Sequence, residues 1–233
     1  MSERPASTAE PRQRWRLVVA RSAAAPDQPQ RDVTDGWIAA IADAGLPVAW
    51  TEGARSRPRI AFGAPLPIGM PANAELIDVV LTERWPAWRL REALADRLPA
   101  GWRLVEVQDV WLAGPPLAGR VAAADYRVVL AGSVPLDRLR VAATELLAAP
   151  SLPRNRARGD GSVEYDLRPL LIDIGVEDGP PVTVTTRTRF HPELGTGRPE
   201  EVVAALAHGA GQPLEASSIV RVRLVLVEDL TLD

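Results

Sequence analysis

The sequence predicts an α+β protein made of two ferredoxin-like units, each a split β-α-β unit with an antiparallel sheet and helices on one face. Three observations support this fold class. Segments in which polar and apolar residues alternate, as in strands, recur along the chain. Segments with apolar residues three or four positions apart, as in amphipathic helices, lie between them. The order strand, helix, strands, helix, strand occurs twice, once before and once after the Ala-Gly-Pro-Pro segment at 113–116.

The first half begins with an expected strand at 14–20 and an expected helix at 33–44, whose apolar residues fall on one face. Gly45 follows as an expected C-cap, and Pro47 prevents the helix from continuing. The other elements expected in this half are extended segments at 48–51 and 59–62, a strand at 75–81, an amphipathic helix at 87–98 and a strand at 102–111.

The second half is expected to repeat this order of elements, although the two halves share no sequence repeat that can be aligned. Its expected elements are a strand at 121–130, a helix at 136–148, short strands at 162–167 and 170–174, a strand at 182–190, a helix at 199–208 and a strand at 219–227. We therefore divide the chain into a disordered tail at 1–13, a first domain at 14–115 and a second domain at 116–233.

The amino-acid composition excludes several kinds of chemistry. The 233 residues include no cysteine, and all 27 basic residues are arginine. The chain therefore has no disulfide, no cysteine-ligated iron–sulfur cluster and no zinc site of the cysteine type. It also lacks the lysine amine that a Schiff base or a P-loop requires. We expect a chain without a cofactor and without redox or metal chemistry of its own.

The charge and the hydropathy pattern bear on partners and location. The formal net charge is −3, so binding to nucleic acid would need a local basic patch rather than an overall field. No run of 18 apolar residues is present, and the polar segment at 1–13 lacks the apolar core of a secretion signal. These features predict a cytoplasmic protein with no membrane partner.

The segment at 30–69 contains Ala-Gly-Leu-Pro-Val-Ala-Trp, then Glu-Gly, Arg-Pro-Arg-Ile, Phe-Gly and Pro-Leu-Pro-Ile-Gly. This pattern resembles the uncharacterised radical SAM-linked protein family, whose members are fused to, or encoded beside, a radical SAM enzyme. The likeness extends from about Arg14 to the C-terminus. Further segments that are similar to the family pattern are 75–78, 99–101, 124–126, 165–169 and 198–201.

The resemblance implies a radical SAM enzyme as partner, and that enzyme would supply the iron–sulfur cluster because this chain has no cysteine. The chain departs from the family pattern at two places. Gln30 stands where the family has histidine, although the aspartate two residues later is kept as Asp32. The segment Ala-Arg-Ser at 54–56 stands where the family has Phe-Asn-Pro.

Two groups of alternating arginines are the main candidates for ligand binding. Alternate residues of an extended chain point to one side, so each group would present its guanidinium groups together. Because guanidinium groups bind phosphate oxygens in pairs, RNA or another phosphorylated ligand is a candidate. The alternative is that they are solvated loop residues, since the chain has no RNP motif and only two Phe and two Tyr. The groups are Arg55, Arg57 and Arg59, and Arg154, Arg156 and Arg158.

Asp32 is the one acidic residue of the candidate site, as an acceptor for a substrate group or for an arginine of the partner. The alternative is a structural role as an N-cap, because Asp32 directly precedes the helix expected at 33–44. The two histidines, His191 and His208, do not have the close spacing of a metal site. We therefore expect no metal.

The seven tryptophans are unusual beside two phenylalanines. Three of them fall on apolar periodic faces and are expected in the core, namely Trp37, Trp88 and Trp102. Three others lie at the ends of elements, where they either pack or line a groove or partner interface, namely Trp50, Trp85 and Trp111.

The leading function predicted from the sequence is a non-catalytic accessory or substrate-binding module that acts with a radical SAM enzyme and binds RNA or a phosphorylated ligand. One alternative is a stand-alone RNA-processing or RNA-modifying enzyme, which needs a general acid and a general base in one cleft. Another is a diverged scaffold protein. The expected contact residues are Asp32, Arg55, Arg57 and Arg59, with Arg154 and Arg156 as a second group.

Overall fold

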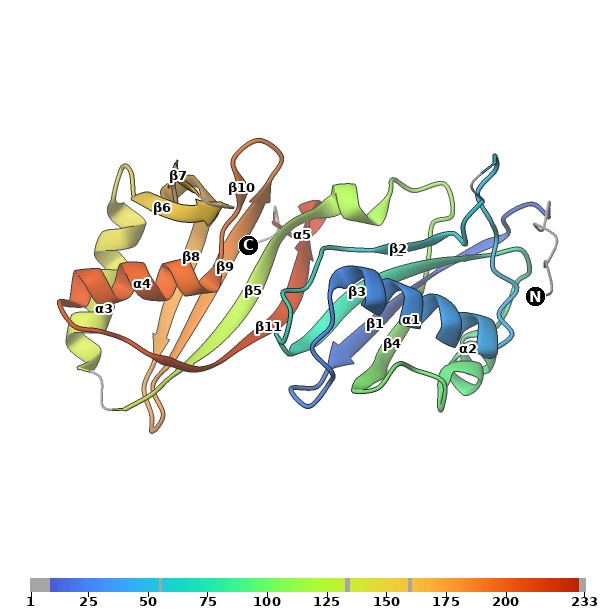
Figure 1. Ribbon diagram of the computed structural model, residues 1–233, viewed down its shortest axis with the longest axis horizontal. Coiled ribbons are helices and arrows are strands. Elements are labelled where there is room, and N and C mark those ends of the chain that lie inside the picture. Colours follow the sequence, from blue (N-terminus) through green and yellow to red (C-terminus); the bar gives the residue numbers. More distant parts are fainter. Residues whose placement is uncertain (1–8, 55, 133–134, 159–160, 231–233) are drawn as a thin grey trace. The chain divides into compact units, whose positions relative to one another are not determined.

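The computed structural model describes residues 9–54, 56–132, 135–158 and 161–230. The chain forms two compact units, unit 1 at Met1–Arg120 and unit 2 at Val121–Asp233. Both are mixed α+β units in which mostly antiparallel strands form a sheet and helices pack on it (Figure 1). The tail expected at 1–13 lies mainly outside the described residues.

Unit 1 follows the order β-α-β-β-α-β in its described residues, and its strands pair antiparallel in the order β4-β1-β3-β2. The η1 turn that ends the unit lies beside β2. The elements are β1 (Gln13–Arg21), α1 (Gln30–Asp43), β2 (Ile60–Phe62), β3 (Ala72–Leu81), α2 (Ala87–Leu94), β4 (Trp102–Val110) and η1 (Leu117–Arg120).

The core of unit 1 lies between its sheet and its two helices. Trp15 and Leu17 alternate along β1, and together with Ile77 of β3 they point to one face of the sheet. Trp37 of α1 and Leu90 of α2 pack against the same face, which both helices cover (Figure 1). Burial of each large apolar side chain contributes about 1.5–3 kcal/mol, so this face holds the unit together. The side chains that alternate with these residues, among them Arg16 and Asp78, point to the opposite face and are buried as well.

The helices of unit 1 begin and end at residues other than those expected. Helix α1 begins at Gln30 with Pro29 as its N-cap, and it ends at Asp43 with Ala44 as its C-cap. Gly45 follows at a φ of 67°, the left-handed conformation that favours glycine after a helix.

Helix α2 ends at Leu94, and Trp88 on it is 66% exposed, so the expectation that Trp88 is a core residue is wrong. Leu90 and Leu94 point to the core, and a residue two positions before Leu90 lies on the far side of a helix. Of the other tryptophans, Trp37 and Trp85 are buried and Trp111 is 75% exposed.

Unit 2 uses the same order of strands with a hairpin added. Its main strands pair antiparallel in the order β11-β5-β9-β8, β10 also pairs with β9, and β6 pairs with β7 in a separate hairpin. The elements are β5 (Val121–Leu130), α3 (Leu136–Ala148), β6 (Pro153–Arg158), β7 (Gly161–Asp166), η2 (Arg168–Leu170), β8 (Leu171–Glu177), β9 (Thr183–His191), β10 (Gly195–Thr196), α4 (Pro199–Ala210), β11 (Ala216–Leu226) and α5 (Val227–Leu230).

The core of unit 2 is formed in the same way as that of unit 1. Leu139 and Leu146 of α3 and Leu206 of α4 pack on one face of the sheet, against Val128 of β5 and Val184 of β9. Both helices therefore cover the same face of this sheet as well. Among the described residues, every helix falls short of the length and apolar character that a membrane crossing requires.

Candidate functional site

A groove of about 440 Å³ in unit 1 brings together charged residues from segments that are far apart in the sequence. Its lining comes from β1, α1, β3, the segment at 57–61 and the segment at 112–117. Three arginines and one aspartate line it, namely Arg14, Arg57, Arg59 and Asp78. We call it the basic groove.

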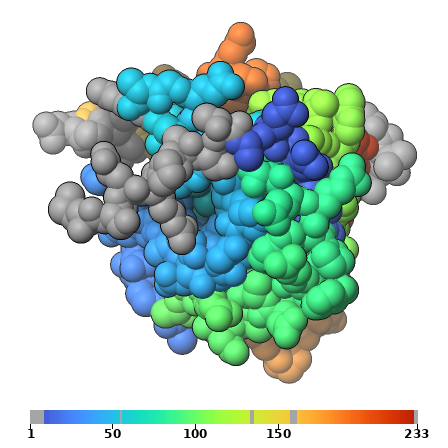
Figure 2. All heavy atoms as spheres, turned by 90° about the vertical axis from the view of Figure 1, so that its right-hand side faces the viewer, coloured from blue at the N-terminus to red at the C-terminus, as the bar shows by residue number. Residues whose placement is uncertain are grey.

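Arg57 belongs to a short hairpin whose two arms are joined by hydrogen bonds to each other. Trp50 pairs with Pro58 across the hairpin, and Thr51 N–H donates to Arg57 O at 2.8 Å. The Thr51 hydroxyl oxygen accepts from Arg57 N–H at 2.9 Å. Gly53, with a φ of 104°, allows the chain to reverse between them. The segment lies at the surface of unit 1, where Figure 2 shows it in cyan.

Arg59 is attached to the sheet by its backbone. Its N–H donates to Ala49 O at 2.8 Å, and its carbonyl accepts from Val80 N–H at 3.0 Å. Arg57 and Arg59 are both exposed, and because they alternate with Pro58 along an extended segment they point to the same side. Within the described residues, neither guanidinium group takes part in an ion pair, so both are free to meet an anionic ligand.

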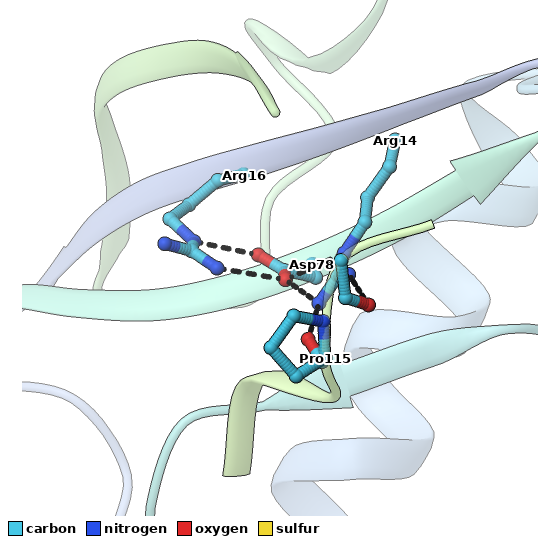
Figure 3. A network of polar contacts seen from close by, with 5 residues as sticks. Arg14, Arg16, Asp78 and Pro115 are labelled. Carbon is cyan, nitrogen blue, oxygen red and sulfur yellow. Dashed lines mark hydrogen bonds and ion pairs between the residues drawn. The ribbon is translucent and has the colours of Figure 1, made fainter. Parts of the chain in front are cut away.

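The floor of the groove is a buried ion cluster of Arg14, Arg16 and Asp78 (Figure 3). Arg14 Nε–H donates to Asp78 Oδ2 at 2.9 Å, and Arg16 donates to Oδ1 at 2.8 Å and to Oδ2 at 3.0 Å. The remaining Arg14 donors reach Gly114 O at 2.9 Å and Pro115 O at 3.1 Å. These hydrogen bonds attach the segment at 114–115 to the face of the sheet opposite the helices.

This cluster places a net positive charge under the groove. The side chains of Arg14, Arg16 and Asp78 are 7%, 5% and 2% exposed, so water hardly reaches them. Two guanidinium groups share one carboxylate, which leaves one positive charge without a carboxylate partner in the cluster. Its field adds to that of Arg57 and Arg59, and a concave site with an excess of positive charge attracts anions.

The residues expected from the sequence are only partly brought together. Arg57 and Arg59 line the basic groove, whereas Arg55 lies outside the described residues. Asp32 is exposed on α1 and does not line the groove. The alternative role of Asp32 as an N-cap is wrong, since the helix begins two residues earlier and Pro29 is the N-cap.

The second arginine group lies in unit 2, on β6. Arg156 donates to both carboxylate oxygens of Glu201 of α4, from Nε at 2.7 Å and from Nη2 at 2.6 Å, and Nη2 also donates to Thr196 O at 3.0 Å. Its guanidinium carbon lies 4.5 Å from the centre of the Tyr165 ring. Arg156 therefore anchors the hairpin, while the half-buried Arg154 donates to Pro153 O at 2.8 Å.

The electrostatics of this anchor follow from its geometry. The hydrogen bonds to Glu201 raise the pKa of Arg156. Burial acts to raise the pKa of Glu201, but the hydrogen bonds from Arg156 outweigh it, and the pKa is lowered. Burial, together with the neighbouring carboxylate of Glu201, raises the pKa of Tyr165 to about 12. All three groups therefore keep their usual charge at neutral pH.

A second ion cluster in unit 2 joins three neighbouring strands. Asp125 of β5 accepts from Arg187 of β9 and from Arg223 of β11, each at 2.7 Å. The two arginines oppose Asp125 in the strand register. Burial acts to raise the pKa of Asp125, but the hydrogen bonds from both arginines outweigh it and lower the pKa.

Sequence reasoning missed the floor of the basic groove. Arg14 and Arg16 were assigned to a strand, and Asp78 was noted for its resemblance to the family pattern, but neither observation linked them. One signal was available: Asp78 interrupts the apolar run at 76–81, and a buried carboxylate needs cationic partners. The partners could not be chosen among 27 arginines without the strand pairing.

Two further features concern metal binding and Gln30, which stands at the position of the family histidine. His, Asp and Glu side chains do not gather in groups of three or more that could hold a metal ion within the described ranges. The Gln30 side chain, at the position of the family histidine, joins the start of α1 to a loop, since its Oε1 accepts from Leu66 N–H at 3.4 Å.

Comparison with known proteins gives a family match and distant structural likenesses. Residues 29–202 match the family model described as "Uncharacterized protein conserved in bacteria (DUF2344)". No curated protein matches the sequence at a significant level.

Among solved structures, the chain is similar at 14% identity to a chain of "Crystal Structure of a Cbf5-Nop10-Gar1 Complex", with a TM-score of 0.43. It is similar, also at 14% identity and with a TM-score of 0.41, to a chain of "Structure of H/ACA RNP bound to a substrate RNA containing 2'-deoxyuridine". Each likeness covers 89% of this chain and 48% or 46% of the other, so this chain spans about half their length. At these TM-scores the likenesses have no bearing on function.

Proposed function

We propose that this chain, which belongs to the bacterial family DUF2344 over residues 29–202, is a binding module for a phosphorylated ligand. The ligand would bind in the basic groove of unit 1. The observation that carries the proposal is the pair of exposed arginines, Arg57 and Arg59, over a buried cluster with net positive charge. Guanidinium groups fixed side by side match the oxygens of a phosphate group.

The groove favours binding over catalysis. Acid–base chemistry needs a carboxylate or another group that can exchange a proton with the substrate. The carboxylate that lines the basic groove is Asp78, and both of its oxygens are occupied by Arg14 and Arg16. Arginine does not exchange protons at neutral pH. The stand-alone enzyme considered from the sequence therefore has no support from this site.

The test is the affinity of the chain for two anionic ligands, pyrophosphate and a fluorescein-labelled single-stranded RNA of ten nucleotides. A hydrogen bond to a charged group contributes about 1.5–3 kcal/mol, so Arg57→Ala and Arg59→Ala are each expected to weaken pyrophosphate binding about tenfold or more. With RNA, the double variant Arg57→Ala/Arg59→Ala is expected to reduce the slope of the logarithm of the binding constant against the logarithm of the salt concentration. The reduction is expected to correspond to about two phosphate contacts.

The matched control is the double variant Arg91→Ala/Arg103→Ala. It removes the same charge from two exposed residues of unit 1 that do not line the groove. An equal loss of affinity in both double variants would mean that overall charge, and not the groove, binds the ligand. The absence of any binding to the unmodified chain would also refute the proposal.

We further propose that the module acts beside a radical SAM enzyme. The support is the sequence pattern at 30–69, which resembles a family linked to such enzymes. The expected result is that a radical SAM protein co-purifies with the tagged chain from its native host at low salt. Recovery of the chain without such a protein, under conditions that preserve other complexes of the host, would contradict this part of the proposal.

The finer description of the fold is also a proposal. We propose that units 1 and 2 are two ferredoxin-like domains, because each has two helices on one sheet face and the same order of four main strands. The boundary expected between 115 and 116 stays a prediction. So do ligand contacts by Asp32, Arg55, Arg154 and Arg156.

A further inference from the structure

A second groove in unit 1, of about 330 Å³, lies between the C-terminal half of α1 and the hairpin that carries Trp50. Its walls are mainly aliphatic side chains. Among the described residues that line it, Trp50 is the one aromatic residue and Glu83 the one charged residue. Sites for small molecules have volumes of about 300–1,000 Å³, so this groove is large enough for one. We call it the apolar groove.

The strand pairing places the side chains of the apolar groove on one face. Val48 pairs with Leu81, Trp50 pairs with Pro58, and paired residues of antiparallel strands point to the same face. Leu81 belongs to the core between the sheet and the helices, so Val48, and Trp50 two positions later, point to the helix side of the sheet. The arginines on either side of Pro58 point the other way, so the apolar groove is a site of its own.

Trp50 and Glu83 lie at the two ends of the apolar groove. Each is two positions from a member of the Val48–Leu81 pair, and because the two segments run antiparallel, Trp50 and Glu83 lie in opposite directions from that pair. Trp50 is 38% exposed, so part of its indole ring is open to a ligand. Both residues line the same groove, and a ligand that contacts both must therefore be elongated.

The end of the apolar groove at Glu83 is negatively charged. Glu83 is exposed, and Thr82 N–H donates to Pro47 O at 2.8 Å, which holds Glu83 beside the segment that follows α1. The last turn of α1 also lines the groove and has no basic residue, and the C-terminal end of a helix carries a partial negative charge. Arg12 and Arg84 share a separate surface hollow with Glu83, but within the described residues neither forms an ion pair with it.

We propose that the apolar groove binds a small organic ammonium compound, whose ammonium group meets the Glu83 carboxylate and whose elongated apolar body packs against Trp50. An ammonium group has three donors and a carboxylate only acceptors, so the two groups match. The aliphatic walls and the indole ring favour an apolar body, and the single carboxylate selects a positive charge. The site is independent of the basic groove, because it uses none of the arginines there.

The test measures the affinities of three compounds at pH 7 by ligand-observed NMR, namely 4-phenylbutylamine, 4-phenylbutanol and butylamine. The first two have the same apolar body, and only the first is charged. Butylamine carries the charge without the ring and also represents the side chain of a lysine. We expect 4-phenylbutylamine to bind about fivefold more tightly than 4-phenylbutanol, the upper range for an exposed ion pair, and at least tenfold more tightly than butylamine.

Substitutions at the two ends of the groove separate the two contacts. Glu83→Gln removes the charge and keeps the size, so it is expected to weaken 4-phenylbutylamine about fivefold and 4-phenylbutanol less than twofold. Trp50→Ala is expected to weaken both phenylbutyl compounds about tenfold and butylamine less than twofold. Trp50→Phe, which keeps an aromatic ring, is expected to retain most of the affinity.

Glu92→Gln and Trp88→Ala are the matched controls, because both residues are exposed on α2 and neither lines the apolar groove. They are expected to leave all three affinities unchanged. Far-ultraviolet circular dichroism of each variant checks that the fold is kept.

Three results would overturn the inference. If 4-phenylbutanol binds as tightly as 4-phenylbutylamine, or if Glu83→Gln weakens both equally, the groove does not select a positive charge. If Trp50→Ala leaves 4-phenylbutylamine unchanged, or if this compound does not bind, the groove is not the site. If butylamine binds as tightly as 4-phenylbutylamine, the side chain of a lysine suffices and no apolar body is recognised. The pyrophosphate test is unaffected by each result, since no variant changes Arg57 or Arg59.

Discussion

Both units contain an aspartate held by two arginines on neighbouring strands, but the two clusters differ in burial. In unit 1, Asp78 of β3 lies between Arg14 and Arg16 of β1, and all three side chains are nearly inaccessible to water. In unit 2, the side chains of Asp125 and Arg223 are 21% and 52% exposed. The same three charges are thus placed in two different environments.

The difference in burial changes how much such a cluster contributes to the stability of its unit. In the buried cluster each charge has lost its water, so the fold depends on all of the hydrogen bonds being present. In the more exposed cluster water can replace a lost partner, and the cluster contributes less. The buried cluster lies under a groove that two further arginines, Arg57 and Arg59, also line. In unit 1, burial therefore makes a cross-strand ion cluster a fixed source of positive charge beneath the basic groove.

The largest effect is expected from Asp78→Asn, which breaks the buried cluster. Two buried guanidinium groups would lose their carboxylate, and breaking a buried pair costs about 3–5 kcal/mol of the free energy of unfolding. All seven tryptophans lie in unit 1, so urea unfolding followed by tryptophan fluorescence reports on this unit. A loss below about 1 kcal/mol would show that the two clusters do not differ as their burial indicates.

A smaller effect is expected from Asp125→Asn in unit 2. Because Arg223 is half exposed and water can solvate it, the loss in the free energy of unfolding is expected to be about 1–2 kcal/mol. Far-ultraviolet circular dichroism in urea measures this change, while tryptophan fluorescence is expected to show an unchanged unit 1. A loss as large as that of Asp78→Asn would remove the contrast between the units.

Acid provides a third test, which concerns unit 2. The pKa values of Asp125 and Glu201 are lowered in the folded state, so their contribution to stability is present above the unfolded-state values of about 4 and is lost as the pH falls through the folded-state values. The urea midpoint of unit 2 is expected to fall between pH 5 and pH 3. In the Glu201→Gln variant this fall is expected to be smaller, and an identical fall would contradict the assignment.

The smallest effect is expected at alkaline pH. The pKa of Tyr165 is raised to about 12, so Tyr165 favours the folded state below the unfolded value of about 10, and this contribution is lost as the pH rises through about 12. Ultraviolet absorbance follows the ionisation of the two tyrosines. In the Tyr165→Phe variant the absorbance change near pH 12 is expected to shrink relative to the unmodified chain, and an identical change in both would refute the shift.

Much of the local structure could be predicted from the sequence. The strand at 121–130 and the helix at 136–148 have the expected bounds, because their apolar periodicity begins and ends sharply. The start of α1 was expected at Val33, three residues too late, since Gln30 to Asp32 are polar and give no signal of the core face. The exposure of Trp88 was missed because an apolar residue was assumed to face inward.

The candidate site was predicted in part, for a physical reason. Alternation of Arg57 and Arg59 is local, so the sequence shows that both point to one side. The arrangement of Arg14, Arg16 and Asp78 depends on the pairing of β1 with β3, which are more than 60 positions apart in the chain. The anchoring role of Arg156 likewise depends on Glu201, a residue of a later helix.

The short strand β2 has a consequence for the behaviour of the molecule in a crowded solution. An outer strand with unpaired backbone groups invites the strands of other molecules to add to the sheet, which is a common first step of aggregation. Strand β2 spans only Ile60–Phe62, and η1 lies beside it. The same stretch of chain that helps to form the basic groove therefore also shields the sheet from unwanted self-association.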